Sequence, residues 1–371
     1  MSGASPLRAL HVHSGNMFGG VERILETLAC GSESSRMTSS FALCFEGRLT
    51  RALAACRASV TDLGPVRATR PWQVARARTE LASLIERAQP DVVLVHSAWS
   101  QALLGPAVRR AGRRLVRWLH APDPGNRWLE LAASRVPLDL LICNSRYTDE
   151  SSRARFPGVP RAVCYAPVPV KSPLDGDRAA VRAALHTPAD AVVVALVARM
   201  EAWKGQRTLV DALSHLRDDP RWHCWIAGGA QVAGESAFVE ELGRRIHSLG
   251  LASRVQLLGD RDDAGRLLAS ADIYCQPNDG PEPFGLSFVE ALAAGLPVVS
   301  TMLGAIPEIV DDTCGVLVAP RAPEEVASAL SQLLADPERR QRLAHGARAR
   351  ATALGDVTRR IDALADALAN S

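Results

Sequence analysis

The sequence alternates short apolar runs with amphipathic helical runs, and this alternation constrains the fold more than any other feature. Residues 91–95 (DVVLV) and 191–197 (AVVVALV) are almost wholly apolar runs of strand length, whereas residues 73–88 repeat apolar side chains at helical spacing. Strands that are apolar on both faces and alternate with helices form doubly wound parallel sheets. We therefore predict an α/β protein. The predicted strands are 7–12, 40–45, 91–95, 115–119, 138–143, 191–197, 222–227, 255–258, 273–276 and 298–299. The predicted helices begin near Val21 and near Phe284 and span 73–88, 102–110, 205–216, 324–334, 337–349 and 357–369.

The length of the chain and one proline-rich segment predict two domains. A chain of 371 residues exceeds one compact core. Residues 166–173 (APVPVKSP) contain three prolines and no hydrophobic period, which is typical of a linker. We place the domains at 1–168 and 169–355, with a closing helix at 356–371, and expect the segment at 166–173 to act as a hinge. Two such sheets should enclose a cleft, with ligands beyond the carboxyl ends of the strands.

Composition predicts a globular cytoplasmic protein. Apolar residues make up 47% of the chain and charged residues 22%. Arg8 and His11 interrupt the N-terminal apolar run, so no secretory signal is expected there. Glycines and prolines break the uncharged stretch 291–307, so we do not expect it to span a membrane. The eight cysteines are scattered and form no Cys-x-x-Cys pair, so we expect buried free thiols in place of disulfides or zinc ligands.

The two halves of the chain differ in charge. Residues 1–170 carry 22 arginines against 13 acidic residues, whereas the remainder is net acidic. A basic domain attracts anionic partners, and we expect peripheral contact with anionic membrane lipids at the inner face of the membrane and no nucleic acid. The alternative is an ordinary solvated surface in a protein that prefers arginine to lysine. The densest cluster comprises Arg109, Arg110, Arg113, Arg114 and Arg117.

The stretch from Gly280 to Val310 combines an anion-binding pattern with two carboxylates. A helix that begins near Phe284 presents backbone N–H groups at its positive end. Glu282 precedes that end and Glu290 lies inside the helix. Donors for a phosphate beside acceptors for hydroxyl groups suggest a ligand with both, such as a sugar nucleotide. The alternative is an amphipathic helix with one cap and one exposed glutamate.

Two cations follow the strand at 191–197. Arg199 and Lys204 stand five residues apart across a turn, just before a helix, and could neutralise a diphosphate. Lys204 is one of only two lysines in the chain, which favours a specific role. The alternative is an exposed ion pair with Glu201 or Asp211.

The first predicted strand is followed by the glycine-rich turn Ser14–Gly20. Glycines there allow the backbone to approach a phosphate or a sugar at a helix N-terminus. The turn lacks the G-x-G-x-x-G spacing of dinucleotide sites, so an ordinary strand-to-helix turn remains the alternative. His11 and His13 share one face of the strand, but no third ligand follows at metal spacing, and we predict no metal site.

Several motifs together resemble one enzyme family. VALVARMEAWKGQRTLVDAL, the E-x7-E of Glu282 and Glu290 around PFG, the N-terminal GNMFGGVERIL and the later IPEIV resemble, in the same order, the retaining glycosyltransferases of family four. The likeness covers essentially the whole chain. It implies a GT-B fold, in which two Rossmann-like domains face each other across a cleft. It also implies an acceptor-side first domain, a nucleotide-sugar-binding second domain and a last helix that crosses back to the first.

The resemblance also implies roles for the second-domain residues. Arg199 and Lys204 would hold the donor diphosphate, and Gly19 and Gly20 would close on it from the first domain. The donor sugar and ribose would be bound by Glu282, by the amides of Phe284, Gly285 and Leu286, and by Glu290, which would take the ribose hydroxyls. These carboxylates would position the donor.

The resemblance also implies a histidine near the donor sugar, at the end of a first-domain strand. His120, which follows residues 115–119, is the candidate catalytic residue together with Glu282. His96 also ends a strand and is its rival, with a structural or acceptor-side role as the alternative. The other candidate acceptor-side residues are Asn16 and Trp99.

The implied reaction is transfer of a sugar, with retention, from a nucleotide-sugar donor to a hydroxyl of a glycan, a lipid-linked sugar or a small molecule. Two cations and helix-end amides can stabilise the leaving diphosphate, so no metal or other cofactor is expected. One alternative is a non-catalytic protein that binds nucleotide sugars or anionic lipids. Another is a sugar-nucleotide epimerase or a phosphorylase of the same fold. A phosphorylase would need a pyridoxal-binding lysine, for which Lys171 in the linker is a poor candidate.

Overall fold

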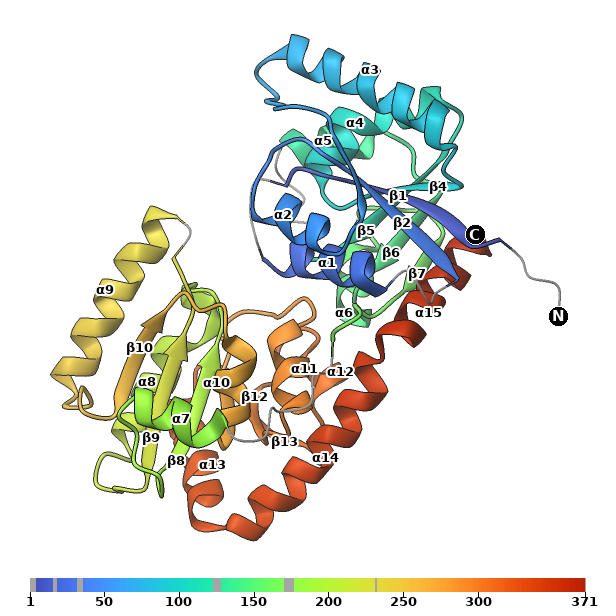
Figure 1. Ribbon diagram of the computed structural model, residues 1–371. Coiled ribbons are helices and arrows are strands. Elements are labelled where there is room, and N and C mark those ends of the chain that lie inside the picture. Colours follow the sequence, from blue (N-terminus) through green and yellow to red (C-terminus); the bar gives the residue numbers. More distant parts are fainter. Residues whose placement is uncertain are drawn as a thin grey trace. The chain divides into compact units, whose positions relative to one another are not determined.

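The chain forms two compact units. The computed structural model describes residues 5–15, 19–31, 36–122, 128–169, 177–230 and 232–370 (Figure 1). Unit 1 comprises Met1–Val168 with Asp356–Ser371, and unit 2 comprises Pro169–Gly355. Asn16 and residues 170–173 of the predicted hinge, Lys171 among them, lie outside the described residues.

Unit 1 is built on a parallel sheet. Its described strands pair in the order β3-β2-β1-β4-β5-β6-β7, so the strand order reverses between β1 and β4. The strands are β1 (Leu7–His13), β2 (Met37–Leu43), β3 (Ser59–Asp62), β4 (Val92–Val95), β5 (Arg114–Leu119), β6 (Leu140–Cys143) and β7 (Arg161–Val163). The helices are α1 (Gly20–Gly31), α2 (Arg48–Ala55), α3 (Pro71–Ala88), α4 (Ala98–Arg110), α5 (Trp128–Ser134), α6 (Arg146–Ser152) and α15 (Val357–Ala369).

The last helix, α15, belongs to unit 1 although it follows unit 2 in the sequence. It packs against α1 and β2. A Cβ atom added at Gly31 would lie only 2.8 Å from Ile361, so the two helices approach closely there. Arg36 holds the helix by an ion pair to Asp366 at 2.5 Å. Apolar packing and a surface pair thus attach the C-terminal end of the chain to unit 1.

Unit 2 repeats the architecture with a smaller sheet. Its described strands pair, all in parallel, in the order β10-β9-β8-β11-β12-β13, and the order reverses between β8 and β11. The strands are β8 (Val192–Val197), β9 (Trp222–Ala227), β10 (Val255–Gly259), β11 (Ile273–Gln276), β12 (Val298–Thr301) and β13 (Gly315–Val318). The helices are α7 (Asp177–Ala184), the short 3₁₀ helix η2 (Ala202–Lys204), α8 (Gln206–Ser214), α9 (Ala233–Ser248), α10 (Ala264–Ser270), α11 (Leu286–Ala293), α12 (Ile306–Ile309), α13 (Pro323–Ala335) and α14 (Pro337–Gly355).

The predicted α/β class and the alternation are therefore confirmed. Strands such as β4 and β8 are buried on both faces, because helices cover each side of the sheet. The elements that the sequence reading missed are mostly short or carry many polar residues. The missed elements are α2, β3, α5, α6, β7, α7, α9, α10, α12 and β13.

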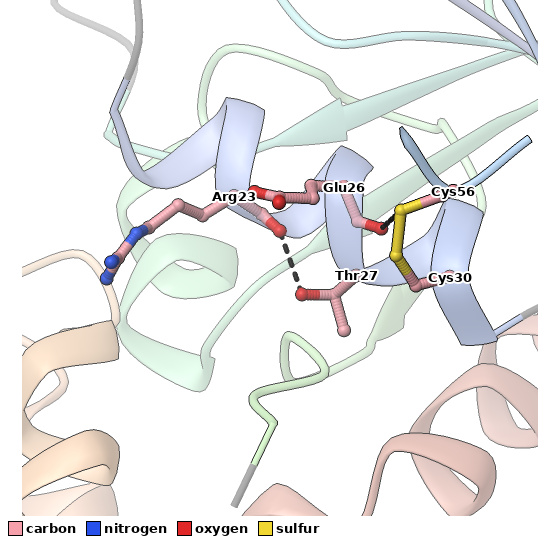
Figure 2. The surroundings of a disulfide bond; sticks show 5 residues. All are labelled: Arg23, Glu26, Thr27, Cys30 and Cys56. Atoms are coloured by element: carbon pink, nitrogen blue, oxygen red, sulfur yellow. Dashed lines mark hydrogen bonds between the residues drawn. A yellow bond between two sulfur atoms is a disulfide. The ribbon is translucent and has the colours of Figure 1, made fainter. Parts of the chain in front are cut away.

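One expectation about the cysteines is wrong. Cys30, near the end of α1, and Cys56, just after α2, form a disulfide (Figure 2). The Cys56 sulfur also lies 3.9 Å from the carbonyl oxygen of Glu26. The two cysteines are 26 residues apart and become neighbours only because the C-terminal ends of two packed helices meet, which no sequence spacing reveals. The six other cysteines are free and buried, as predicted.

The arginine cluster of the first domain is less open than its sequence suggests. Arg117 is only 4% exposed and pairs with Glu130. Arg109 pairs with Asp139, Arg113 bonds Gln89, and Arg114 donates to the carbonyl of Leu368. Much of the cluster is thus engaged by unit 1 itself.

None of the described helices combines the length and the apolar character needed to span a bilayer.

Candidate active site

A charged network occupies the carboxyl-terminal edge of the unit 2 sheet. Lys204 ends η2, in the loop after β8, and Glu282 lies in the loop after β11. The Lys204 Nζ donates to Glu282 Oε2 at 2.7 Å and to Oε1 at 3.0 Å. The side chains are 14% and 6% exposed, and the ammonium also lies 4.0 Å from the centroid of the Trp203 ring. A largely desolvated ion pair therefore stands at the point where the strand order reverses.

Neutral donors complete the surroundings of Glu282. Asn278 Nδ2 donates to its Oε2 at 3.0 Å, and Gln276 Nε2 does so at 3.3 Å. Gln276 is itself oriented by the Tyr274 hydroxyl, which donates to its Oε1 at 2.5 Å. A carboxylate offers about four lone-pair directions. Among the described residues, Oε2 accepts from three donors and Oε1 from Lys204 alone, so Oε1 keeps room for one more.

Backbone contacts fix the position of Glu282. The Glu282 carbonyl accepts from the Ala305 amide at 2.8 Å, and Glu282 forms a β-bridge with Gly304. Gly304 has φ +65°, and a Cβ added to it would lie 2.3 Å from the Glu282 carbonyl oxygen. Only glycine allows this approach, so the carboxylate is placed by the loops after two neighbouring strands.

Helix α11 begins slightly later than its sequence predicts. Its first residue is Leu286 and its N-cap is Gly285, which has φ +91°, so the predicted start at Phe284 is two residues early. Phe284 is 3% exposed and contributes to the core. Glu290 lies half-buried in α11. Burial above all, with a smaller effect of the charges of Glu282 and Glu290, raises the pKa of Tyr274 well above its ordinary value, so Tyr274 stays a neutral donor.

Arg199 lies two residues after β8, but its ion-pair partners differ from Glu282, the partner of Lys204. Its Nη2 pairs with Glu235 at 2.6 Å and with Glu201 at 3.3 Å. The ion pair with Glu201 is thus formed, whereas Asp211 bonds Arg245. Arg199 is 35% exposed at its side chain, and within the described part of the chain its Nε is buried without a hydrogen-bond partner.

Residues 16–18 of the glycine-rich turn lie outside the described residues, and its described end, Gly19, is bonded to the helix that follows. Glu22, in the first turn of α1, accepts the Gly19 amide at 2.8 Å through Oε2 and contacts His13 Nε2 at 2.8 Å through Oε1. Burial raises the pKa of the Glu22 carboxyl, but the hydrogen bonds and charge of His13 and the Gly19 amide outweigh it and lower the pKa overall. An ionised Glu22 thus caps the turn, and the Gly19 amide is already in use.

Beside this turn, three histidines form one hydrogen-bonded row. His11 lies on β1, His96 directly follows β4 and His120 directly follows β5. His11 Nδ1 lies 3.0 Å from His96 Nε2, and His96 Nδ1 lies 3.0 Å from His120 Nε2. The adjacent rings stack, with centroids 5.2 and 5.3 Å apart. From the sequence, His96 and His120 are alternative candidates for one role, whereas in the structure they are hydrogen-bonded neighbours.

Burial keeps this row uncharged. It lowers the pKa of His11 to about 3, and it lowers the pKa of His120 to about 3 with help from nearby His13 and Arg117. It also lowers the pKa of His96 well below its ordinary value, assisted by the neighbouring histidines. Each imidazole is therefore neutral at physiological pH.

The remaining candidates are less informative. Trp99 on α4 packs against the hydrophobic core of unit 1, and Asn16 lies outside the described residues. Among the residues that the structure describes, no three histidine, cysteine or acidic side chains are arranged to hold a metal ion. Sequence reasoning missed Glu22, Glu235, Gln276 and Asn278 as network members. Gln276 and Asn278 do flank Pro277 at the end of a predicted strand, which is a usable signal.

Comparisons with known proteins cover both units. The model of "Glycosyltransferase Family 4" matches residues 18–171, and that of "Glycosyl transferases group 1" matches residues 177–350. A D-inositol 3-phosphate glycosyltransferase of Xylanimonas cellulosilytica is 32% identical over 280 residues, which are 71% of this chain and 63% of that protein. This chain thus spans less than two thirds of that relative. A GDP-mannose-dependent alpha-(1-6)-phosphatidylinositol monomannoside mannosyltransferase of Mycolicibacterium smegmatis is 30% identical, covering 70% of this chain and 72% of that protein.

Solved structures agree in fold. Anabaena Alr3699/HepE in complex with UDP superposes with a TM-score of 0.87 at 25% identity, and 98% of this chain and 100% of that chain are covered. The same protein in complex with UDP-glucose gives a TM-score of 0.86. The similarity extends over essentially the whole chain.

Proposed function

The chain belongs to glycosyltransferase family 4, and from this premise we propose that it transfers a sugar, with retention, from a nucleotide-sugar donor to a hydroxyl group of an acceptor. The family resemblance of its motifs and the GT-B fold are confirmed. The observation that carries the proposed activity is the buried Lys204–Glu282 pair at the switch point of the unit 2 sheet.

The donor diphosphate is proposed to bind at this edge of unit 2. Lys204 and Arg199 supply positive charge, and the amides at the N-terminal end of α11 supply hydrogen-bond donors. Glu282 neutralises part of the Lys204 charge before the donor binds, which supports a pre-organised cation. A developing diphosphate leaving group gains from such fixed charges without a metal ion, so we propose that none is needed.

The carboxylates are proposed to position the donor sugar nucleotide. The Oε1 of Glu282, which accepts from Lys204 among the described residues, can also accept a sugar hydroxyl, while Glu290 takes the ribose hydroxyls. His120 is proposed to contact the transferred sugar. The Gly19 amide can reach a phosphate only if Glu22 releases it, so Gly20 is the better candidate of the two glycines.

The donor is proposed to be a nucleoside diphosphate sugar, and relatives suggest two bases. One structural neighbour was solved with UDP-glucose and one relative is named for GDP-mannose. The acceptor is proposed to be a glycan, a lipid-linked sugar or a small polyol. Names of relatives that act on inositol derivatives favour a polyol-containing acceptor as the first to try.

The test is a transfer and hydrolysis assay with UDP-, GDP- and ADP-sugars, in which release of the nucleoside diphosphate is measured with and without EDTA. We expect one base to be preferred, EDTA to have no effect, and both Lys204→Ala and Glu282→Ala to lose at least tenfold in rate. Arg207→Ala, which removes an exposed cation paired with Glu241, is the control and should keep full activity. Activity that survives both site variants would overturn the site assignment.

The alternative is a non-catalytic protein that binds nucleotide sugars. It predicts binding of the same nucleotide with no release of product for any acceptor. Contact with anionic lipid stays a separate proposal, because the contacts described above engage only part of the arginine excess of unit 1. Absence of binding to anionic liposomes at low salt would remove it.

A further inference from the structure

The guanidinium group of Arg199 meets its carboxylate partners through one nitrogen. Its Nη2 lies 2.6 Å from Glu235 Oε1 and 3.3 Å from Glu201 Oε1, whereas its Nε is buried without a hydrogen-bond partner in the described part of the chain. Nε and Nη2 lie on one edge of the planar guanidinium, which matches the two oxygens of a carboxylate or a phosphate. Other arginines of this chain bond one carboxylate with both nitrogens of that edge, as do Arg8, Arg153, Arg221 and Arg261. By that standard, the bonds of Arg199 to its two acids are incomplete.

Glu235 is the closer and the more buried of the two acids. It lies in the first turn of α9, where the partial positive charge of the helix end stabilises a carboxylate. Its side chain is 8% exposed, against 24% for Glu201. Nη1 of Arg199 forms no hydrogen bond within the described residues and is not buried, so an anion can reach the guanidinium there. Glu235 thus holds one side of a cation whose other side is open.

The formal charges of these contacts do not yet suit a polyanion. Arg199 and Lys204 contribute two positive charges, and Glu201, Glu235 and Glu282 contribute three negative ones. Glu282 accepts from three side chains and is also fixed by its backbone, so it is not the acid that yields to a ligand. Glu201 is exposed enough to turn away. The contact of Glu235 with Arg199 is therefore the one that opposes a diphosphate.

We propose that Glu235 competes with the donor diphosphate for the charge of Arg199, and that this competition helps the nucleoside diphosphate product to leave. When the diphosphate binds, Nη2 of Arg199 exchanges the carboxylate for a phosphate oxygen, and the reverse exchange accompanies release. Release of product limits turnover in many enzymes. Glu235 touches no reacting atom and acts through Arg199. The identity of the anion as the donor diphosphate rests on the proposed function.

The first test measures binding to the intact protein by calorimetry. UDP, GDP and inorganic pyrophosphate are titrated into the wild type, into Glu235→Gln and into Glu241→Gln. Glu235→Gln keeps the shape of the side chain and replaces a charge-assisted bond with a neutral one of about half its strength, so we expect the preferred nucleotide and pyrophosphate to bind at least about fivefold more tightly.

The control removes the same charge from the same helix. Glu241 of α9 forms an exposed pair with Arg207, and Glu241→Gln should stay within about twofold of the wild type. Unchanged or weaker binding to Glu235→Gln would refute the competition and would mean that Glu235 orients Arg199 for the ligand.

The second test asks whether the gain in affinity comes through Arg199. Arg199→Gln should weaken binding, and adding Glu235→Gln to it should change the affinity no more than Glu241→Gln does. Two changes that act on one contact are not additive. A full gain in the Arg199→Gln background would show that Glu235 acts by its long-range field alone and would overturn the proposal.

The third test follows turnover with the preferred donor. Glu235→Gln should be inhibited by lower concentrations of the nucleoside diphosphate product and should have a lower KM, whereas its kcat should not rise. A role in packing alone predicts a lower kcat without tighter product inhibition, and that result would contradict the proposal.

Binding and turnover together separate this inference from the proposed function. If the wild type binds the nucleotide but transfers no sugar, the proposed function fails, and the competition stands on the binding data. If sugar is transferred but Glu235→Gln binds the nucleotide no more tightly than the wild type, the proposed function stands and the competition fails.

Discussion

The carboxyl-terminal edges of the two sheets carry buried polar networks of opposite character. In unit 2 the network is ionic, and Lys204, Glu282 and their amide neighbours satisfy almost all of one another's hydrogen-bonding groups. In unit 1 the row of three histidines is neutral, and it ends in buried nitrogens without partners among the described residues. Both networks lie where the strand order of their sheet reverses.

The two networks differ in whether they contain a buried charge that must be compensated. A buried cation must be compensated before the ligand arrives, because an unpaired charge in such a site is costly. A row of neutral imidazoles carries no charge that must be compensated. The ionic network is therefore expected to control anion affinity, and the neutral row to make the stability of unit 1 depend on pH.

The largest predicted effect is the loss of the Glu282 carboxylate. Glu282→Ala leaves the Lys204 ammonium and two amides without their acceptor, and breaking one partner of a buried pair costs about 3–5 kcal/mol. Urea unfolding of unit 2, followed by hydrogen exchange of its peptides, measures this. Glu241→Ala removes one partner of the exposed pair with Arg207 and should cost less than about 1 kcal/mol. Similar losses for the two variants would refute the ionic part of the comparison.

Reduction of the disulfide should destabilise unit 1 and spare unit 2. A cross-link between residues 26 apart destabilises the unfolded chain by about 3.5 kcal/mol in the loop-entropy model. Cys30→Ser with Cys56→Ser should reproduce the effect of a reductant, as measured by hydrogen exchange of each unit. If the double variant is as stable as the oxidised protein, the disulfide does not hold α1 and α2 together in solution.

Two glycines of unit 2, one in a tightly packed loop and one in open space, test how closely the loops of this unit pack. Gly205 and Gly250 both have positive φ, at +81° and +72°. A Cβ at Gly205 would lie 2.0 Å from the Pro277 carbonyl oxygen, whereas one at Gly250 meets nothing within 4 Å. Gly250→Ala should cost about 1 kcal/mol from backbone strain alone, and Gly205→Ala about 2–3 kcal/mol. Equal costs in denaturant titrations would show that the two loops are not packed as described.

The neutral histidines predict a dependence of stability on pH. Their folded-state pKa lies near 3 for His11 and His120, below the unfolded value of 6.5. The unfolded chain therefore binds more protons in this interval, and their contribution is complete above pH 6.5 and is lost as the pH falls toward 3. His11→Phe should reduce the slope of unfolding free energy for unit 1 by about 1 kcal/mol per pH unit between pH 6 and 5. His247→Gln, on the exposed side of α9, is the control, and an unchanged slope in His11→Phe would contradict a buried neutral row.

Sequence reasoning predicted the fold better than the site. Residues 191–197 are recognisable as a strand because a strand buried on both faces is continuously apolar. Residues 73–88 are recognisable as a helix because a helix buried on one face repeats its apolar residues every three or four positions. The partner of Lys204 lies 78 residues away, and no local pattern encodes that distance. His96 and His120 were each noticed at a strand end. Their hydrogen bond depends on β4 and β5 being neighbours, which is a property of strand order.

Titration calorimetry of the nucleoside diphosphates tests the central claim most directly. UDP and GDP are titrated into the wild type, into Lys204→Gln, which keeps a donor for Glu282 but removes the charge, and into Arg207→Gln, which removes an exposed charge elsewhere in unit 2. A charge-assisted hydrogen bond contributes about 1.5–3 kcal/mol, so the account predicts that Lys204→Gln weakens binding of the preferred nucleotide by at least about tenfold. Arg207→Gln should stay within about twofold of the wild type, because an exposed cation contributes little. Equal affinities in all three proteins would contradict the assignment of the donor diphosphate to the ionic network of unit 2.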